Sequence, residues 1–276
     1  MKWRWQDLTA GKLTLNEEQE VEIAVSAYEA SLNLQIWKNY VDEIGVSVIH
    51  PGGTAIGPLQ RIQGTQRFQL GETNLLVYYG EPSPYNPYQE IYLDFIPVGS
   101  YIDDGIWKIR LTPIRITDGA FDMWLPAGNV LNSGTGFLNP VEETTLTIPS
   151  TATKVITVGA YDARFDQAAA FSGRGYTRAT NQVKPDLVAP GVEIMSCAPG
   201  GGYQVRTGTS MATPFVTGSA ALLMQWGIVN GNDAYLYGEK MKAYLIRGAR
   251  KLPGFTVYPN PVLGWGALCT ANSIPR

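Results

Sequence analysis

One serine in this chain has neighbours that could make it a nucleophile. Ser210 lies in the segment Gly-Thr-Ser-Met-Ala-Thr-Pro at residues 208–214, and small and apolar residues at helical spacing follow it. We therefore expect Ser210 at or just before the first turn of a helix, where backbone N–H groups lack partners and the helix dipole favours an oxyanion. The competing interpretation is an ordinary N-cap, which is the commonest role of a serine that precedes a helix.

The chain offers such a serine only one candidate imidazole base. His50 is the single histidine, and chemistry at a serine hydroxyl usually needs an imidazole to take its proton. His50 lies in Ile-His-Pro-Gly-Gly at residues 49–53, a turn that follows a predicted strand. We expect a solvated turn residue and assign it no catalytic role.

The serine segment resembles the serine motif of the subtilase family, including the Phe-Val-Thr-Gly-Ser-Ala-Ala-Leu that follows at residues 215–222. Four upstream segments, at residues 148–152, 155–160, 170–175 and 184–191, occur in the order found in such proteases. The resemblance covers about residues 146–276. It implies that Ser210 is the nucleophile and that its backbone N–H, with support from Thr209, holds the oxyanion, whereas Asp186 and Pro190 are structural.

The other members of a subtilase triad are absent from this sequence. In the family the order along the chain is Asp, His, Ser, and the chain has no Asp-Ser/Thr-Gly and no His-Gly-Thr-His segment. Asn129, in Pro-Ala-Gly-Asn at residues 126–129, is either a side-chain oxyanion donor or a turn residue, and we favour the turn. For Arg174 and Arg206, which flank the motif region, we favour solvated charges or loop packing over substrate clamps.

The elements before residue 140 predict an all-β domain. Apolar residues alternate with other residues in five stretches, namely Val21/Ile23/Val25, Leu32/Leu34/Ile36, Val46/Val48, Ile91/Leu93/Phe95 and Trp107/Ile109/Leu111. Turn clusters separate them, which favours an antiparallel sandwich or jelly roll over residues 1–140. Residues 78–85 and 122–126 resemble a clostridial subset of subtilases, including the Csp-type germination proteases, which carry a jelly-roll insert. That resemblance implies a brace or a docking surface.

The elements after residue 140 predict an α/β part that would position Ser210. Residues 144–148 and 155–160 predict short strands, and the second is a continuous apolar run typical of a buried parallel strand. We expect helices from Met211 to about Trp226 and from about Asn232 to Arg247, with Gly248 ending the second. Residues 141–276 would then be the C-terminal part of a doubly wound, subtilisin-like parallel sheet.

Composition excludes several classes of partner and cofactor. Charged residues make up 16% of the chain and the formal net charge is -3, which argues against binding to nucleic acid or to an anionic membrane. No uninterrupted apolar run reaches eighteen residues, and residues 1–7 lack the apolar core of a signal peptide, so we expect a soluble chain with no visible export signal. Cys197 and Cys269 are expected to be ordinary thiols, and no acidic cluster has calcium-ligand spacing, so we expect no metal and no cofactor.

Three hypotheses for function follow. The first is the C-terminal portion of a subtilisin-like serine endopeptidase, which hydrolyses peptide bonds of a peptide or protein substrate only when an N-terminal half supplies the Asp and His. The second is a pseudoprotease or fragment without catalysis that binds a protein partner. The third is self-association, since half of a subtilase sheet would expose a strand edge and apolar helix faces.

Overall fold

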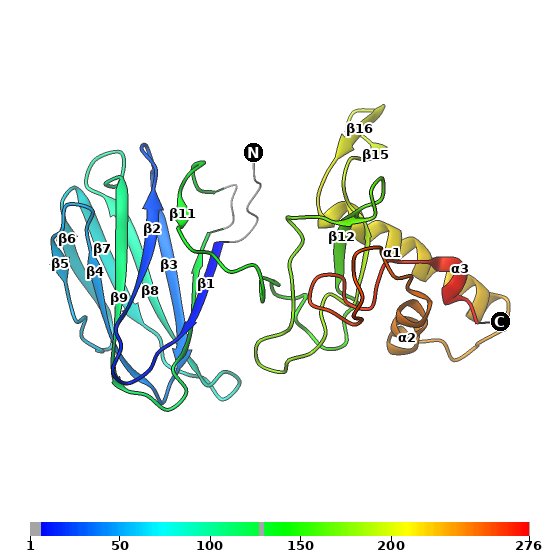
Figure 1. Ribbon diagram of the computed structural model, residues 1–276. Coiled ribbons are helices and arrows are strands. Elements are labelled where there is room, and N and C mark those ends of the chain that lie inside the picture. Colours follow the sequence, from blue (N-terminus) through cyan, green and yellow to red (C-terminus); the bar gives the residue numbers. More distant parts are fainter. Residues whose placement is uncertain (1–6, 127–129, 276) are drawn as a thin grey trace. The chain divides into compact units, whose positions relative to one another are not determined.

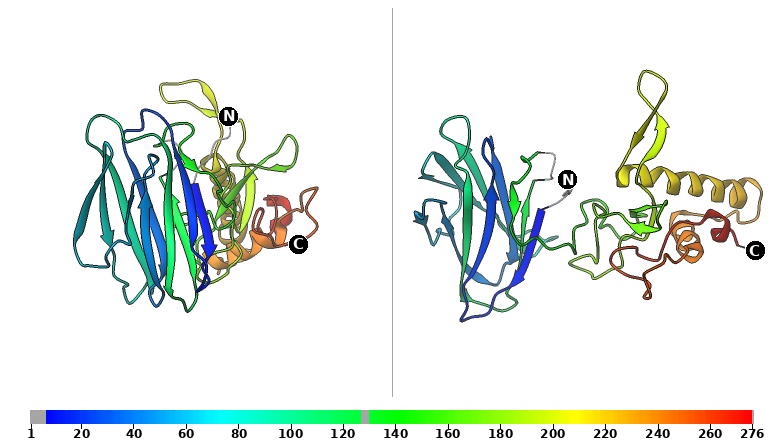
Figure 2. Two further views of the ribbon diagram at one scale, coloured as in Figure 1. Left: turned by 60° about the vertical axis from the view of Figure 1, so that its left-hand side comes forward. Right: turned by 45° about the horizontal axis from the view of Figure 1, so that its top comes forward.

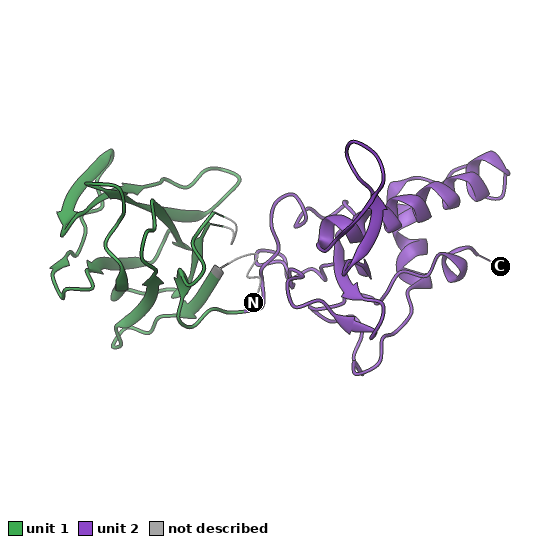
Figure 3. Cartoon of the chain, turned by 90° about the horizontal axis from the view of Figure 1, so that it is seen from above, with its two compact units in different colours: residues 1–141 green, residues 142–276 purple. Residues whose placement is uncertain are grey.

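The computed structural model describes residues 7–126 and 130–275 of the chain. The chain folds into two compact units, Met1–Val141 and Glu142–Arg276, coloured green and purple in Figure 3. The described part of the first unit is made of strands and turns, whereas the helices belong to the second (Figure 1). Each unit has its own hydrophobic core.

The first unit consists of two antiparallel sheets. The six-stranded sheet has the order β1 (Asp7–Lys12), β10 (Ala120–Leu125), β3 (Leu32–Asn39), β8 (Tyr88–Pro97), β7 (Thr73–Tyr79) and β6 (Thr65–Leu70). The five-stranded sheet has the order β11 (Gly136–Phe137), β2 (Gln19–Val25), β9 (Gly105–Arg115), β4 (Glu43–Ile49) and β5 (Ala55–Ile56). The five alternating stretches of the sequence are the strands β2, β3, β4, β8 and β9, so the prediction of half-buried strands is confirmed.

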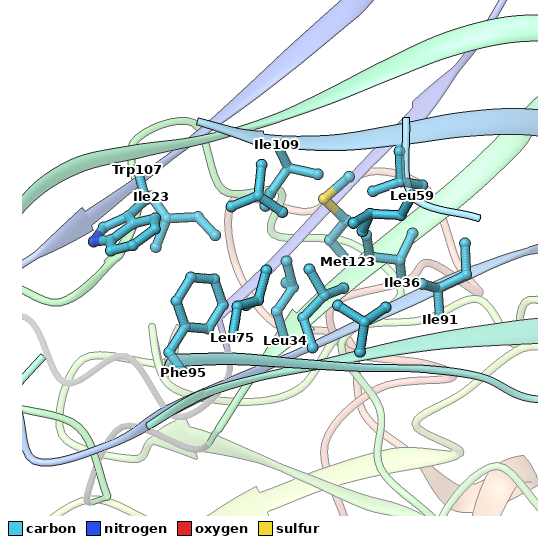
Figure 4. Packing of buried hydrophobic residues seen from close by; sticks show 14 of the residues in the cluster. Ile23, Leu34, Ile36, Leu59, Leu75, Ile91, Phe95, Trp107, Ile109 and Met123 are labelled. Atoms are coloured by element: carbon cyan, nitrogen blue, oxygen red, sulfur yellow. The ribbon is translucent and has the colours of Figure 1, made fainter. Parts of the chain in front are cut away.

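The core of this unit lies between the two sheets. Alternate residues of β3 are buried, as period two requires, and its Leu34 and Ile36 belong to the same cluster as Phe95 and Trp107 (Figure 4). The Phe95 and Trp107 rings meet edge to face with centroids 5.1 Å apart. Burying a large apolar side chain contributes about 1.5–3 kcal/mol, so this cluster is the main source of the unit's stability.

A polar network occupies the turn after β3. Lys38 is buried, and its Nζ donates to the carbonyl oxygens of Asp42 at 2.6 Å and of Asn39 at 3.2 Å. Burial, assisted by the positive charge of Arg61, lowers the pKa of Lys38 to about 8. The Asp42 carboxylate accepts three backbone N–H groups, from residues 117, 118 and 119. Burial opposes the charge of Asp42, but these hydrogen bonds outweigh it and lower its pKa.

The second unit is a small sheet covered by helices, and Figure 2 shows α1 from two further sides. Strand β12 (Val158–Asp162) pairs in parallel with β14 (Leu187–Pro190) and antiparallel with β13 (Gln167–Ala168). A separate hairpin is formed by β15 (Ile194–Cys197) and β16 (Tyr203–Arg206), and it leads into α1 (Thr209–Met224). A π-helical turn, η1 (Gln225–Val229), continues α1, and α2 (Gly238–Gly248) and α3 (Thr270–Ser273) follow.

The expected buried parallel strand at residues 155–160 is therefore present as β12, shifted by a few residues. The prediction of a strand at residues 144–148 is wrong. Instead of joining a ladder, Thr144 and Thr145 donate their N–H groups to the carbonyls of residues 175 and 174 in a loop, and Thr144 has a φ of 61°. The second expected helix begins later, at Gly238, because Leu236 packs into the core from the preceding turn.

Candidate active site

Ser210 lies in the first turn of α1. The helix begins at Thr209 and its N-cap position is Gly208, which has no side chain and makes no capping hydrogen bond. Ser210 is therefore inside the helix and is not its N-cap, so the ordinary capping interpretation does not apply. The Ser210 side chain is exposed.

The first two turns of α1 border an open hollow. It has a volume of about 490 Å³ and is lined by Ser210, Thr213, Pro214 and Thr217. The hydroxyls of Thr213 and Thr217 are bonded back to the carbonyls of residues 209 and 213, at 3.1 and 3.2 Å. Within the described part of the chain, the Ser210 hydroxyl has no such hydrogen-bond partner. Ser210 is thus the lining hydroxyl that is free to act on a ligand.

Backbone donors and the helix dipole both act at the start of α1, where Ser210 lies. The first N–H groups of an α-helix have no carbonyl four residues back, and the dipole gives this end a partial positive charge. Met211 N–H is bonded to the Gly208 carbonyl at 3.0 Å, whereas the Ser210 N–H has no backbone acceptor among the described residues. An oxyanion beside Ser210 would be stabilised by this donor.

Helix α1 packs with one side against the small sheet. It packs on β12 and β14 and buries Ala212, Val216 and Leu223 against the core of the unit. Its inward serine, Ser219, shares a hydrogen bond of 2.6 Å with Thr270 at the start of α3. The apolar spacing of residues 212–223 therefore decides which side of α1 faces the sheet, and Ser210 lies on the opposite side.

A glycine connects the sheet to the loop before Ser210. Gly191 donates to the Tyr161 carbonyl at the end of β12 and accepts from the Gly208 N–H at 2.8 Å. A Cβ atom at this position would lie 2.6 Å from the Cβ of Ala160 and 2.9 Å from the Gly208 carbonyl oxygen. Only glycine allows this close approach, so Gly191 positions the residue two before Ser210. The Pro190-Gly191 pair in the sequence was a signal for this turn.

A buried ionic network holds the start of β14. Lys184 Nζ donates to Asp186 Oδ2 at 2.8 Å, and Lys242 Nζ lies 2.8 Å from Asp186 Oδ1. The same Asp186 side chain accepts the Thr157 N–H at 2.7 Å. Burial lowers the pKa of Lys184, and the Asp186 carboxylate opposes that shift. The network ties β14 to the entry of β12 and agrees with the structural role expected for Asp186.

The described surroundings of His50 belong to the first unit. Its side chain is only 15% exposed, with Nε2 3.2 Å from Asp103 Oδ2, and its Nδ1 accepts the Gly52 N–H at 2.9 Å. The expectation of a solvated turn histidine was therefore wrong, because a non-local partner covers the ring. Burial opposes the charge on Asp103, but the Thr73 hydroxyl, His50 and the Glu72 N–H lower the pKa of that carboxyl.

The other candidates are separate from the serine. Arg174 forms an ion pair with Glu142 in a loop of the second unit, as expected for loop packing. Arg206 ends the β15–β16 hairpin and is exposed. Asn129 lies outside the described residues. The structure therefore brings Ser210, Thr209 and the backbone donor together. The sequence indicated Gly191 only as part of a turn at a strand end, and the structure adds its bond to Gly208.

Known proteins resemble this chain in sequence and in structure. The sequence model described as the subtilase family matches residues 125–266, just over half of the chain. The chain belongs to the subtilase family. Serine protease AprX of Bacillus subtilis is 34% identical over 169 residues, which cover 54% of this chain and 36% of that protein. The intracellular serine protease of Paenibacillus polymyxa is 46% identical over 77 residues, covering 28% of this chain and 21% of that protein.

A solved subtilase structure resembles both units. The CspB protease of Clostridium perfringens superposes with a TM-score of 0.88 and 37% identity, over 97% of this chain and 55% of that chain. This subtilase is thus Csp-like, as the segments at residues 78–85 and 122–126 indicated. The chain spans only about a third of AprX and about half of CspB.

Proposed function

We propose that this chain carries the nucleophile of a subtilisin-like serine endopeptidase, with Ser210 attacking the peptide carbonyl of a peptide or protein substrate. The observation that carries the proposal is an exposed serine in the first turn of α1, beside its own free N–H and an open hollow. The Ser210 N–H, supported by Thr209, would hold the tetrahedral oxyanion while the helix dipole stabilises its charge.

The proton of Ser210 needs a base that these 276 residues do not obviously supply. His50 is the only histidine, and its ring faces Asp103 and the Trp107 indole in the first unit. We therefore propose that an N-terminal subtilase part bearing the Asp and His completes the triad. In that assembly the second unit would be the C-terminal part of a doubly wound sheet, and the first unit a jelly-roll brace.

The outer side of α1 supports this complementation. Apolar residues occur all around the helix, and on the side away from the sheet Phe215, Leu222, Met224 and Ile228 are each 42–54% exposed. Helix and π-turn together are long and apolar enough to cross a membrane, a test that buried core helices also pass. A helix with apolar residues on the side away from its own sheet as well is typical of the interior of a larger protein. A second layer over α1 would bury this side.

The test is labelling with a fluorophosphonate serine probe. The 276-residue chain is probed alone and after mixing with an N-terminal subtilase part that bears the Asp and His. We expect labelling in the mixture and none in the Ser210→Ala variant, whereas Ser196→Ala, which removes an exposed hydroxyl from β15, should label normally. An assembled complex that never labels would refute the proposal, and labelling of the chain alone would refute the need for a second part.

A second candidate is a pseudoprotease that only binds a protein partner. The observation that favours it is the side-chain environment of His50, which already has a carboxylate partner in its own unit. This function predicts no probe labelling under any condition and a partner whose binding survives Ser210→Ala. Self-association through the exposed side of α1 is the remaining alternative, and light scattering at increasing concentration would reveal it as a rising mass.

A further inference from the structure

The outer face of the six-stranded sheet carries a row of aromatic side chains. Trp124 of β10 lies opposite Gln35 of β3, Gln35 opposite Tyr92 of β8, and Tyr92 opposite Tyr78 of β7. These residues alternate with core residues of the same strands, so they share the face turned away from the core. Neighbouring strands are about 4.8 Å apart, so Tyr92 and Tyr78 are adjacent residues on this face.

Two carboxylates of β8 flank this row, and a third, the buried Asp122 of β10, lies opposite Trp37 on the same face. Glu90 and Asp94 lie two residues before and two after Tyr92 on β8, and Glu90 is directly opposite Trp37. Burial raises the pKa of Glu90 and of Asp94, and burial together with these two charges raises the pKa of Tyr92. Among the residues that the structure describes, neither Glu90 nor Asp94 forms an ion pair with a lysine or arginine. Both are half-buried negative charges without a cation to balance them.

On the outer face of the five-stranded sheet, basic side chains form ion pairs with acidic ones. There Lys108 pairs with Glu20 and Glu22 at 3.3 and 3.1 Å, and Arg110 pairs with Glu20 at 2.7 Å. Cross-strand pairs of this kind are ordinary on a solvated sheet. The charges of the six-stranded sheet are arranged differently, since its acidic residues on β8 lie among aromatic rings while its arginine, Arg67, lies on the edge strand β6.

We propose that the face formed by Trp37, Tyr78, Glu90, Tyr92 and Asp94, here called the aromatic–acidic face, docks an extended basic segment of a partner protein. One lysine or arginine would pair with Glu90 over the Trp37 ring, and a second would pair with Asp94. Four residues of a strand span about 13 Å, so an extended peptide with basic residues four apart matches the two carboxylates. Each cation gains both a carboxylate and an aromatic neighbour.

A basic polypeptide fits this face better than a glycan does. Aromatic rings on a flat sheet also stack on sugars, but a neutral sugar would cover Glu90 and Asp94 without supplying a positive charge. Covering an unpaired carboxylate is costly, whereas pairing it with a cation as water is displaced offsets that cost. The two unbalanced charges therefore select a cationic partner.

The test uses a fluorescein-labelled peptide with arginines four residues apart, separated by serine and glycine, and anisotropy with the full 276-residue chain at about 0.15 M salt. We expect saturable binding that weakens at least about tenfold in Glu90→Gln and in Trp37→Ala. The charge-matched control Glu43→Gln, on the opposite sheet, should change affinity by less than about twofold. Circular dichroism of each variant confirms that the sheet is intact.

Three results would overturn the proposal. Equal loss in Glu43→Gln and Glu90→Gln would mean attraction to net charge alone. An unsaturable or absent signal with the arginine peptide would mean that the face does not bind basic segments. Saturable binding of a chito-oligosaccharide that is lost in Trp37→Ala but kept in Glu90→Gln would identify a glycan surface instead. Neither the test nor its outcomes depend on Ser210.

Discussion

The substitution Asp186→Asn isolates the contribution of the buried network beneath the serine helix. The wild-type carboxylate faces Lys184, whose side chain is 1% exposed, and Lys242, whose side chain is 16% exposed. Asparagine keeps the shape and can still accept the Thr157 N–H, but it leaves the Lys184 ammonium without a counter-charge. Breaking a buried ion pair from one side costs about 3–5 kcal/mol. That is a large fraction of the ~5–15 kcal/mol by which a domain is stable.

Hydrogen exchange followed by mass spectrometry measures this cost within one unit. Peptides covering β12 and β14 should exchange roughly a hundred- to a few thousand-fold faster in Asp186→Asn, since about 1.4 kcal/mol corresponds to a factor of ten. Peptides from β3 and β8 in the other unit serve as an internal reference and should not change. Because two units unfold in this chain, a single melting temperature would not separate them.

Two further variants locate the effect in the charge of Lys184. Lys242→Met leaves the Lys184–Asp186 pair intact and should cost only about 1 kcal/mol, because its ammonium is closer to solvent. Adding Lys184→Met to Asp186→Asn removes the stranded charge and should recover part of the loss. If Asp186→Asn speeds exchange less than tenfold, or if Lys242→Met is equally damaging, the reasoning from a buried unpaired ammonium is refuted.

Three other substitutions test separate features. Gly191→Ala should displace the loop before Ser210 and slow probe labelling of the complemented protein by about tenfold or more, because small misplacements of a reacting group are costly in catalysis. The control is Gly238→Ala, whose added Cβ atom would have no neighbour within 4 Å, and this variant should label normally. The pKa of Lys38, lowered to about 8, means that the unfolded chain binds more protons above that pH. The unfolding free energy of the first unit, measured by urea titration, should therefore rise by about 2 kcal/mol between pH 8 and 10. In Lys38→Met this rise should be smaller, and an equal dependence of the unfolding free energy on pH in both proteins would contradict the prediction. Asp42 has a lowered pKa, so its stabilisation is present above the unfolded value of 3.8 and is lost as the pH falls through the folded value. Asp42→Asn should cost about 2 kcal/mol at neutral pH and make acid unfolding shallower, and an unchanged acid transition would argue against it.

Local patterns predicted the elements that position the candidate site. Period two identified β3 and β8, and the apolar run at residues 155–160 identified β12, because one or two buried faces impose these patterns on neighbouring residues. Helical spacing after Ser210 predicted α1 to within two residues of its observed ends. The prediction of a strand at residues 144–148 failed because Thr144 takes a φ of 61° and the N–H groups of residues 144 and 145 are bonded to a loop at 174 and 175, contacts that no local pattern shows.

The sequence by itself determined the family, the alternation of the strands and the helix that carries Ser210, since each depends on residues close together in the chain. Tertiary structure alone decided the rest. It paired His50 with Asp103, placed Gly191 against Ala160 and the loop before Ser210, and set Glu90 among aromatic rings from other strands. These contacts join residues tens of positions apart, so the packing of distant strands and loops, and not any local pattern, determines which of them meet.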